Sequence, residues 1–178
     1  DIANAIYDGT TAIMLSGESA AGKYPVEAVE TMARIAECAE KDLNYRGRMD
    51  ELASKCNPDT TTAISYATCT TAMDLHASAI ITVTMSGFTA TKVAKYKPSC
   101  PIISCSVNAR VCKQLNLLWG CKPLLLPEKD DTEELFDAAV EEAKKAGYIK
   151  DGDLVVITAG VPLGKSGTTN MIRVVEVK

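Results

Sequence analysis

The sequence predicts an α/β fold with an open, mostly parallel five-stranded sheet, helices on both faces and an antiparallel strand at one edge. Two observations predict it. From residue 60 onward, short and continuously apolar runs alternate with longer amphipathic segments, which is typical of strands buried on both faces and separated by helices. Only about ten residues separate the last two apolar runs, too few for a crossover helix, so the last strand should run antiparallel.

The first 42 residues read as one βα unit. The apolar residues of 1–8 end at Gly9, as in the last turns of a helix with a glycine cap. The apolar run 11–15 predicts a buried strand, which the polar loop 16–18 follows. Pro25 then begins a helix with an apolar face made of Val26, Val29, Met32, Ala33 and Ala36.

Residues 41–57 are highly charged and lose this pattern, so we interpret them as a linker partly covered by a short helix. The predicted domains are therefore 1–42 and 43–178. In the second domain the predicted helices are 60–76, 89–96, 109–116 and 132–146, and the predicted strands are 79–84, 102–106, 122–126, 154–158 and 171–177.

Composition excludes several classes of protein. The 178 residues are 47% hydrophobic and 24% charged, which is typical of a globular core with a solvated surface. A net charge of −4 argues against a nucleic-acid partner, and no apolar run reaches the roughly 20 residues that span a membrane.

The cysteines and the single histidine predict no metal site. The seven cysteines include no C-x-x-C pair and lie in apolar stretches, so we expect reduced core thiols in a cytoplasmic protein. His76 has no second histidine to join it, so we expect a surface or interface role for it.

The first candidate binding loop is 84–89, between a predicted strand and a predicted helix. It offers the hydroxyls of Thr84, Ser86 and Thr89 beside the permissive Gly87. A loop of this kind at a helix N-terminus suits a phosphate. The alternative is that Ser86 or Thr89 only caps the helix.

The second candidate loop is 160–169, after the strand 154–158. It is not a P-loop, because Ala159 stands where the first glycine is required and a strand follows instead of a helix. A glycine-rich loop can still hold phosphate with its backbone N–H groups. The loop supplies glycine, lysine, serine and threonine residues, among them Lys165, Ser166, Gly167 and Thr168.

Several motifs carry a resemblance to one family. Residues 14–20 read M-L-S-G-E-S-A and, with 21–29, resemble the eighth βα unit of the pyruvate kinase barrel, although Ser19 stands where that family usually has Thr. Further similarity, in chain order, appears at N-A-I-Y-D-G (4–9), D-T-T-T-A-I (59–64), S-G-F-T-A (86–90), Y-K-P (96–98), G-V-P (160–162) and G-T-T-N (167–170).

The resemblance implies that 1–42 is the end of the catalytic (β/α)8 barrel, a TIM barrel, and that 43–178 is the C-terminal allosteric domain. Pyruvate kinases transfer a phosphoryl group from phosphoenolpyruvate to ADP with Mg2+ and commonly K+. Only Ser16 and Glu18 would line the active site here, because the family's metal and phosphoryl ligands lie upstream of this sequence. We therefore expect this chain to bind no metal and to be inactive alone.

The resemblance also implies an effector site and an oligomer. In members regulated by sugar phosphates the effector lies between the two loops, which matches Thr84, Ser86, Gly87 and Thr89 with Lys165, Ser166, Gly167 and Thr168. Lys165 offers a point charge where some fructose-bisphosphate-activated members have an arginine. The family implies a tetramer, and the strand 171–177 should pair two chains into a dimer. The alternative is a free-standing module that binds phosphate compounds, which 1–41 argue against.

Overall fold

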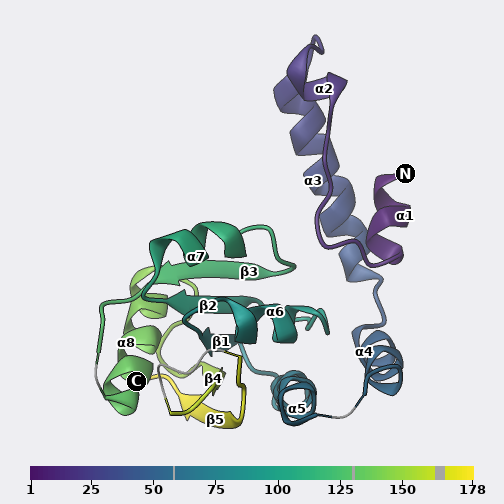
Figure 1. Cartoon of the computed structure of the whole chain (residues 1–178). Helices are drawn as coiled ribbons and strands as arrows, with labels where there is room; N and C mark the ends of the chain where they lie inside the picture. Colours follow the sequence, from purple (N-terminus) through teal and green to yellow (C-terminus); the bar gives the residue numbers. More distant parts are fainter. Residues whose placement is uncertain (58, 130, 163–166) are drawn as a thin grey trace. The chain divides into compact units, whose positions relative to one another are not determined.

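The computed structural model describes residues 1–57, 59–129, 131–162 and 167–178. The chain forms two compact units, Asp1–Asn44 and Tyr45–Lys178, which are described separately (Figure 1). None of the helices in these described ranges is long and apolar enough to cross a membrane.

The first unit contains α1 (Ile2–Tyr7), α2 (Gly17–Ala20) and α3 (Pro25–Lys41). The predicted helices at both ends of the unit are confirmed, with Gly9 at φ +84° after α1 and Pro25 in the first turn of α3. The hydroxyl of Tyr7 donates to the Asp42 carboxylate at 3.4 Å, which ties α1 to the end of α3.

The predicted strand at 11–15 is wrong. The segment has no strand assignment, and Met14 is 84% exposed. A strand needs a hydrogen-bonding neighbour, and no strand of the described first unit lies beside it. The polar loop predicted after it begins the one-turn helix α2 instead.

The second unit alternates helices and strands as predicted. Its elements are α4 (Tyr45–Ser54), α5 (Thr60–Asp74), β1 (Ala79–Val83), α6 (Phe88–Ala94), β2 (Ile102–Ser106), α7 (Ala109–Leu115), β3 (Cys121–Leu125), α8 (Thr132–Lys145), β4 (Leu154–Ala159) and β5 (Met171–Glu176). The side chain of Met49 in α4 is fully buried, so this helix is packed into the unit.

The five strands form one sheet in the order β3-β2-β1-β4-β5. β1 pairs in parallel with β2 and β4, and β2 pairs in parallel with β3, while β5 pairs antiparallel with β4. The predicted five-stranded, mostly parallel sheet with an antiparallel edge strand is confirmed.

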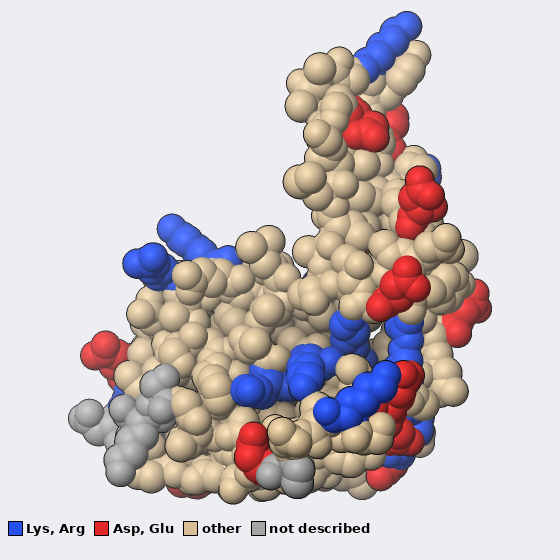
Figure 2. Space-filling view, turned by 45° about the vertical axis from the view of Figure 1, so that its right-hand side comes forward, with Lys and Arg blue, Asp and Glu red and all other residues tan. Residues whose placement is uncertain are grey.

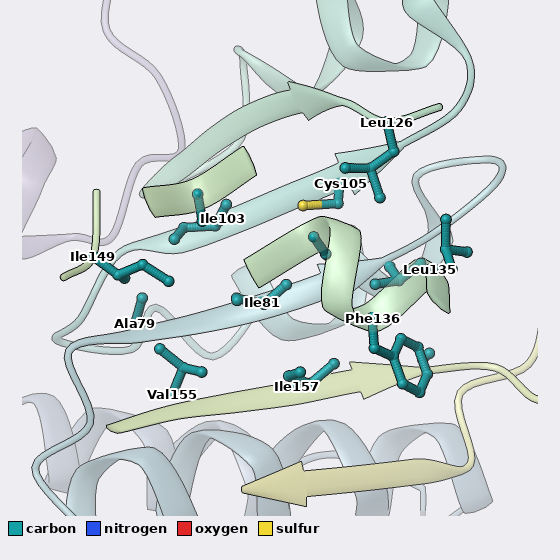
Figure 3. Close-up of a cluster of buried hydrophobic side chains, with 14 of the residues drawn as sticks. Ala79, Ile81, Ile103, Cys105, Leu126, Leu135, Phe136, Ile149, Val155 and Ile157 are labelled. Carbon is teal, nitrogen blue, oxygen red and sulfur yellow. The ribbon is translucent and has the colours of Figure 1, made fainter. Parts of the chain in front are cut away.

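Each face of the sheet has its own hydrophobic core. On one face, Ile81, Ile103 and Ile157 pack against Phe136 and other residues of α8 (Figure 3). On the other face, Ile80, Ile102 and Val156 pack against α4, α5 and α6. Successive residues of a strand point to opposite faces, so a continuously apolar run fills both cores.

All seven cysteines are free in the structure. Burial raises the pKa of Cys105 to about 12 and that of Cys100 to about 11, and it raises the pKa of Cys69 further still. These three thiols therefore behave as small apolar core residues.

Candidate functional site

The two candidate loops leave the sheet side by side. Val83 at the end of β1 is in register with Ala159 at the end of β4, so the loops that follow these strands begin at the same edge. The strands β1, β2 and β3 follow one another outward in one direction, and β4 is then added on the other side of β1. The direction in which strands are added therefore reverses between β1 and β4. In open α/β sheets, ligands bind outside the carboxyl ends of the strands at this reversal point.

The first loop is folded by Thr84 and Gly87. Thr84 is buried, and its Oγ1 accepts a hydrogen bond from the backbone N–H of Gly87 at 3.0 Å. Gly87, rather than Ser86 or Thr89, is the N-cap residue of α6, and its φ of +84° favours glycine. A Cβ there would also lie 3.2 Å from Cδ2 of Leu115 in α7. The loop therefore packs closely against α7.

The second loop is closed at its base by Asn170. The side-chain amide of Asn170 accepts from the N–H of Val161 at 2.9 Å and donates to the carbonyl of Val161 at 2.7 Å. Next to this clamp, Gly160 lies so close to Thr168 that any Cβ on it would overlap the Thr168 carbonyl oxygen. The hydrogen bonds of Asn170 thus hold the described ends of the loop together, and Gly160 allows their backbones to approach closely because it has no side chain.

A buried threonine contact joins the two loops. Oγ1 of Thr89 lies 2.9 Å from Oγ1 of Thr169, and both residues are at most 2% exposed. The backbone N–H of Thr169 donates to Oγ1 of Thr61 in the first turn of α5 at 3.3 Å. We call Thr61, Thr89 and Thr169 the threonine junction. It brings α5, α6 and the end of the second loop to one point.

Sequence reasoning missed most of these structural residues. It named Thr89 as a candidate ligand, whereas the structure buries its hydroxyl against Thr169. Gly160 and Thr169 fall within the second candidate loop, 160–169, but no structural role was predicted for either. Thr61 and Asn170 occur only in the motifs D-T-T-T-A-I and G-T-T-N, which carry the resemblance.

The remaining predicted ligands differ in exposure. Ser86, Gly167 and Thr168 are exposed at the surface, while Thr84 is buried. The predicted ligands Lys165 and Ser166 lie outside the described residues.

Charge near the first loop is mixed. Nζ of Lys92 lies 5.1 Å from the ring centroid of Phe88, in the first turn of α6. The pKa of Asp59, the N-cap of α5, is lowered mainly by the hydrogen bond from the backbone N–H of Thr62, and Lys92 contributes to the lowering. Lys92 is thus a cation beside Phe88 in the first loop, and the carboxylate of Asp59 lies near this cation.

The arrangement is suited to binding rather than to chemistry. The exposed residues Ser86 and Thr168 carry hydroxyls of the kind that recognise an anion, whereas the N–H of Gly87 already donates to Thr84 and the hydroxyl of Thr89 lies against Thr169. His76 lies between α5 and the start of β1, whereas the first loop follows the end of β1, and its φ is +51°. The described part of the chain holds no group of three or more His, Cys, Asp or Glu residues that could bind a metal.

Ser16 and Glu18 lie together in the first unit. The backbone N–H of Ser16 donates to Oε2 of Glu18 at 3.1 Å, and both residues are exposed. Ser16 is the N-cap of α2. The carboxylate of Glu18 therefore folds back over the start of this short helix.

Two family models match the chain. The model described as "Pyruvate kinase, alpha/beta domain" matches residues 62–175. The model described as "Pyruvate kinase, barrel domain" matches residues 1–29.

Similar proteins carry the same family name. The chain is 51% identical over 174 residues to a pyruvate kinase of Clostridium acetobutylicum, covering 98% of this chain and 37% of that protein. It is 47% identical over 174 residues to a pyruvate kinase of Geobacillus stearothermophilus, covering 98% and 30%. A crystal structure of a pyruvate kinase from Cryptosporidium parvum matches with a TM-score of 0.90 at 31% identity, covering 99% of this chain and 35% of that one. The chain thus spans about a third of the length of the curated relatives it matches.

Proposed function

The chain belongs to the pyruvate kinase family, and on that premise we propose that it carries the effector-binding and subunit-interface part of a glycolytic enzyme. The reaction of the longer enzyme is phosphoryl transfer from phosphoenolpyruvate to ADP, giving pyruvate and ATP. The seven cysteines are all free, which suits a reducing cytoplasm, where we place the protein.

We further propose that this chain does not catalyse the reaction alone. Phosphoryl transfer needs cations on the transferring oxygens, which the family supplies as Mg2+ and K+. The described residues do not fit such an ion, because no group of three potential ligands lies together. A coupled assay of the chain with Mg2+ and K+ should detect no turnover. Turnover within about a hundredfold of a full-length relative would contradict this proposal.

Residues 1–42 are, in this proposal, the end of the catalytic barrel. The residues Met14, Val26 and Val29 are 84%, 64% and 46% exposed. So many exposed apolar residues in one short segment fit a segment that packs against the rest of a barrel domain in the longer enzyme. Ser16 and Glu18 would form part of the active-site wall, where their polar groups would hold water near the substrate.

The second unit would bind a phosphorylated effector between the two loops. The threonine junction is the single observation that carries this proposal, because it shows that loops 80 residues apart in sequence meet at the ends of β1 and β4. The proposed ligands are the sequence-predicted set: Thr84, Ser86, Gly87, Thr89, Lys165, Ser166, Gly167 and Thr168. Thr84 folds the first loop by accepting from Gly87, and Thr89 joins that loop to Thr169, so in this proposal both position the exposed groups of Ser86, Gly167 and Thr168.

Calorimetry with fructose 1,6-bisphosphate, ribose 5-phosphate and AMP tests the effector site. We expect heat of binding from at least one of them at millimolar concentration. Ser86→Ala combined with Lys165→Ala should weaken it several-fold or more, since a hydrogen bond to a charged group contributes about 1.5–3 kcal/mol. Ser99→Ala, at an exposed position before β2, is the matched control and should bind normally. No heat from any of the three compounds would contradict the proposal.

The alternative is a free-standing module that binds phosphate compounds without an enzymatic parent. The match of residues 1–29 to a barrel-domain model favours the enzyme. The sequence that precedes residue 1 in the gene decides between them, because a barrel with metal-binding carboxylates must be found there if the enzyme proposal is right.

The edge strand β5 would join two chains into a dimer, and the complete enzyme would be a tetramer. Val174 in β5 is 42% exposed. At the opposite edge, Pro123 in β3 removes a backbone donor, so that edge is protected against pairing while the described β5 contains no proline. Arg173 pairs with Glu133 in the same chain, so backbone and apolar contacts should dominate this interface.

Val174→Pro tests this interface without breaking the sheet. Val177 donates to the carbonyl of Asp153 at 2.8 Å, and donors alternate in direction along a strand, so the N–H of Val174 points away from β4. We expect the wild-type chain to sediment as a dimer at tens of micromolar, Val174→Pro as a monomer, and Val174→Thr, which keeps the donor, as a dimer. A monomeric wild-type chain would rule the interface out.

A further inference from the structure

Cys56 differs from the core cysteines because a lysine contacts its sulfur. It lies between α4 and Asp59, the N-cap of α5, and is partly exposed. Nζ of Lys95, the residue that follows α6, lies 2.9 Å from Sγ of Cys56. The two residues are 39 positions apart, so the fold and not the local sequence brings them together.

The groups around Cys56 favour its thiolate. Its pKa is lowered, first by the hydrogen bond from Lys95 and also by the charge of Lys95, against the opposing effects of burial and of the Asp59 carboxylate. The pKa of Tyr96 is raised to about 12, mainly by burial and then by Cys56, and its protonated hydroxyl donates to the carbonyl of Thr62 at 3.4 Å. The neutral thiol has one other partner, the carbonyl of Leu52 at 3.1 Å.

The charged groups near the sulfur of Cys56 are the ammonium of Lys95 and the carboxylate of Asp59, of which only Lys95 hydrogen-bonds the sulfur. Figure 2 shows Lys and Arg side chains gathered on one face of the second unit, with Asp and Glu side chains beside them. Lys95 itself is exposed, so a small molecule in solvent can approach the pair without any rearrangement of the core. Reactive cysteines are found in such electropositive and partly exposed places, whereas buried cysteines are inert.

We propose that Cys56 and Lys95 form a modification site for hydrogen peroxide, with Cys56 as the nucleophile and Lys95 as the group that positions the sulfur and donates a proton. The pair contains no residue of the two candidate loops, and its role does not depend on the function proposed above.

The step is a two-electron oxidation of the sulfur. The Cys56 thiolate attacks one oxygen of hydrogen peroxide, forming an S–O bond while the O–O bond breaks. The sulfur is oxidised to a sulfenic acid and the peroxide is reduced. The departing hydroxide takes a proton from the Lys95 ammonium and leaves as water, so the thiolate, the peroxide and the ammonium become a sulfenic acid, water and a neutral amine.

Cys38 provides the internal comparison, because it is more exposed than Cys56. If exposure alone governed reactivity, Cys38 would react first. The full chain is treated with dilute hydrogen peroxide at pH 7 in the presence of dimedone, which traps sulfenic acid, and the adducts are followed by peptide mass spectrometry. We expect the Cys56 adduct to form at least about threefold faster than the Cys38 adduct.

Two variants separate the charge of Lys95 from its packing. In Lys95→Gln, the Cys56 adduct should form more slowly than the Cys38 adduct. In Lys95→Arg, which keeps a cationic donor, the Cys56 adduct should form at most of the wild-type rate. The pH at which alkylation of Cys56 by iodoacetamide reaches half its maximal rate should rise in Lys95→Gln and not in Lys95→Arg. A wild-type chain in which Cys38 reacts faster would overturn the proposal, and an unchanged Cys56 rate in Lys95→Gln would overturn the role of Lys95.

Discussion

The buried contact between Thr89 and Thr169 makes a sharp prediction about stability. Thr169→Val removes one hydroxyl of the pair. The hydroxyl of Thr89, a residue that is 2% exposed, then stays buried without this partner. Leaving a buried polar group without its partner costs about 1–3 kcal/mol, and Thr89→Val should cost a similar amount for the same reason. The double variant leaves neither hydroxyl behind, so it should be no less stable than either single variant.

Trp119 provides the assay. It is the only tryptophan in the sequence and lies buried in the second unit, so its fluorescence during urea unfolding reports on that unit and not on residues 1–44. Thr91→Val is the matched control. The Thr91 hydroxyl donates to the Gly87 carbonyl, which also accepts the Thr91 N–H, so no group loses its last partner and the cost should stay below about 0.5 kcal/mol.

A double-mutant cycle measures the coupling energy between the two hydroxyls. We expect a coupling energy of about 1–3 kcal/mol between Thr89 and Thr169. If the two single effects simply add, within about 0.5 kcal/mol, then the two hydroxyls do not depend on each other and the threonine junction does not hold the loops together.

Three further predictions use the same fluorescence assay. Gly160→Ala should destabilise the second unit by about 1–3 kcal/mol or more, because the new methyl group overlaps the Thr168 carbonyl oxygen; a neutral effect would show that the base of the second loop is not closed. Met49→Ala should cost about 2–5 kcal/mol, since this side chain is fully buried; a cost below about 1 kcal/mol would show that α4 is not part of the second unit. The pKa of Asp59 is lowered in the folded chain, so its contribution is present above its unfolded pKa and is lost as pH falls through its folded pKa. Wild type should therefore lose more stability than Asp59→Asn between about pH 5 and pH 2, since asparagine still caps the helix, and equal losses would contradict the assignment.

The strands of the second unit were predictable because burial on both faces leaves a direct mark on the sequence. The segment 154–158 is apolar at nearly every position, and in the structure Val155 and Ile157 belong to one core and Val156 to the other. The same mark at 11–15 gave a wrong prediction. An apolar run predicts a strand only when neighbouring strands are present to bond with it, and the described first unit contains none.

The candidate loops were predictable because each follows a recognisable strand, but the contacts between them were not. Thr169 contacts Thr89, which is 80 residues away in the sequence, and Thr61, which is 108 residues away. A local sequence pattern cannot predict contacts between residues so far apart in the sequence. The strand order is equally non-local, since the position of β4 beside β1 depends on which face α8 covers. Lys95 and Cys56 were missed for the same reason.

If the loops after β1 and β4 form one phosphate site, an NMR titration of the 15N-labelled chain will show it at the amides of both loops. On addition of fructose 1,6-bisphosphate, ribose 5-phosphate or AMP, we predict that the amide signals of 84–89 and 167–169 shift together with a single dissociation constant for at least one compound. Unphosphorylated fructose should shift neither group. Shifts confined to one loop, shifts located elsewhere on the chain, or no shifts at millimolar concentrations of all three phosphate compounds would contradict the claim.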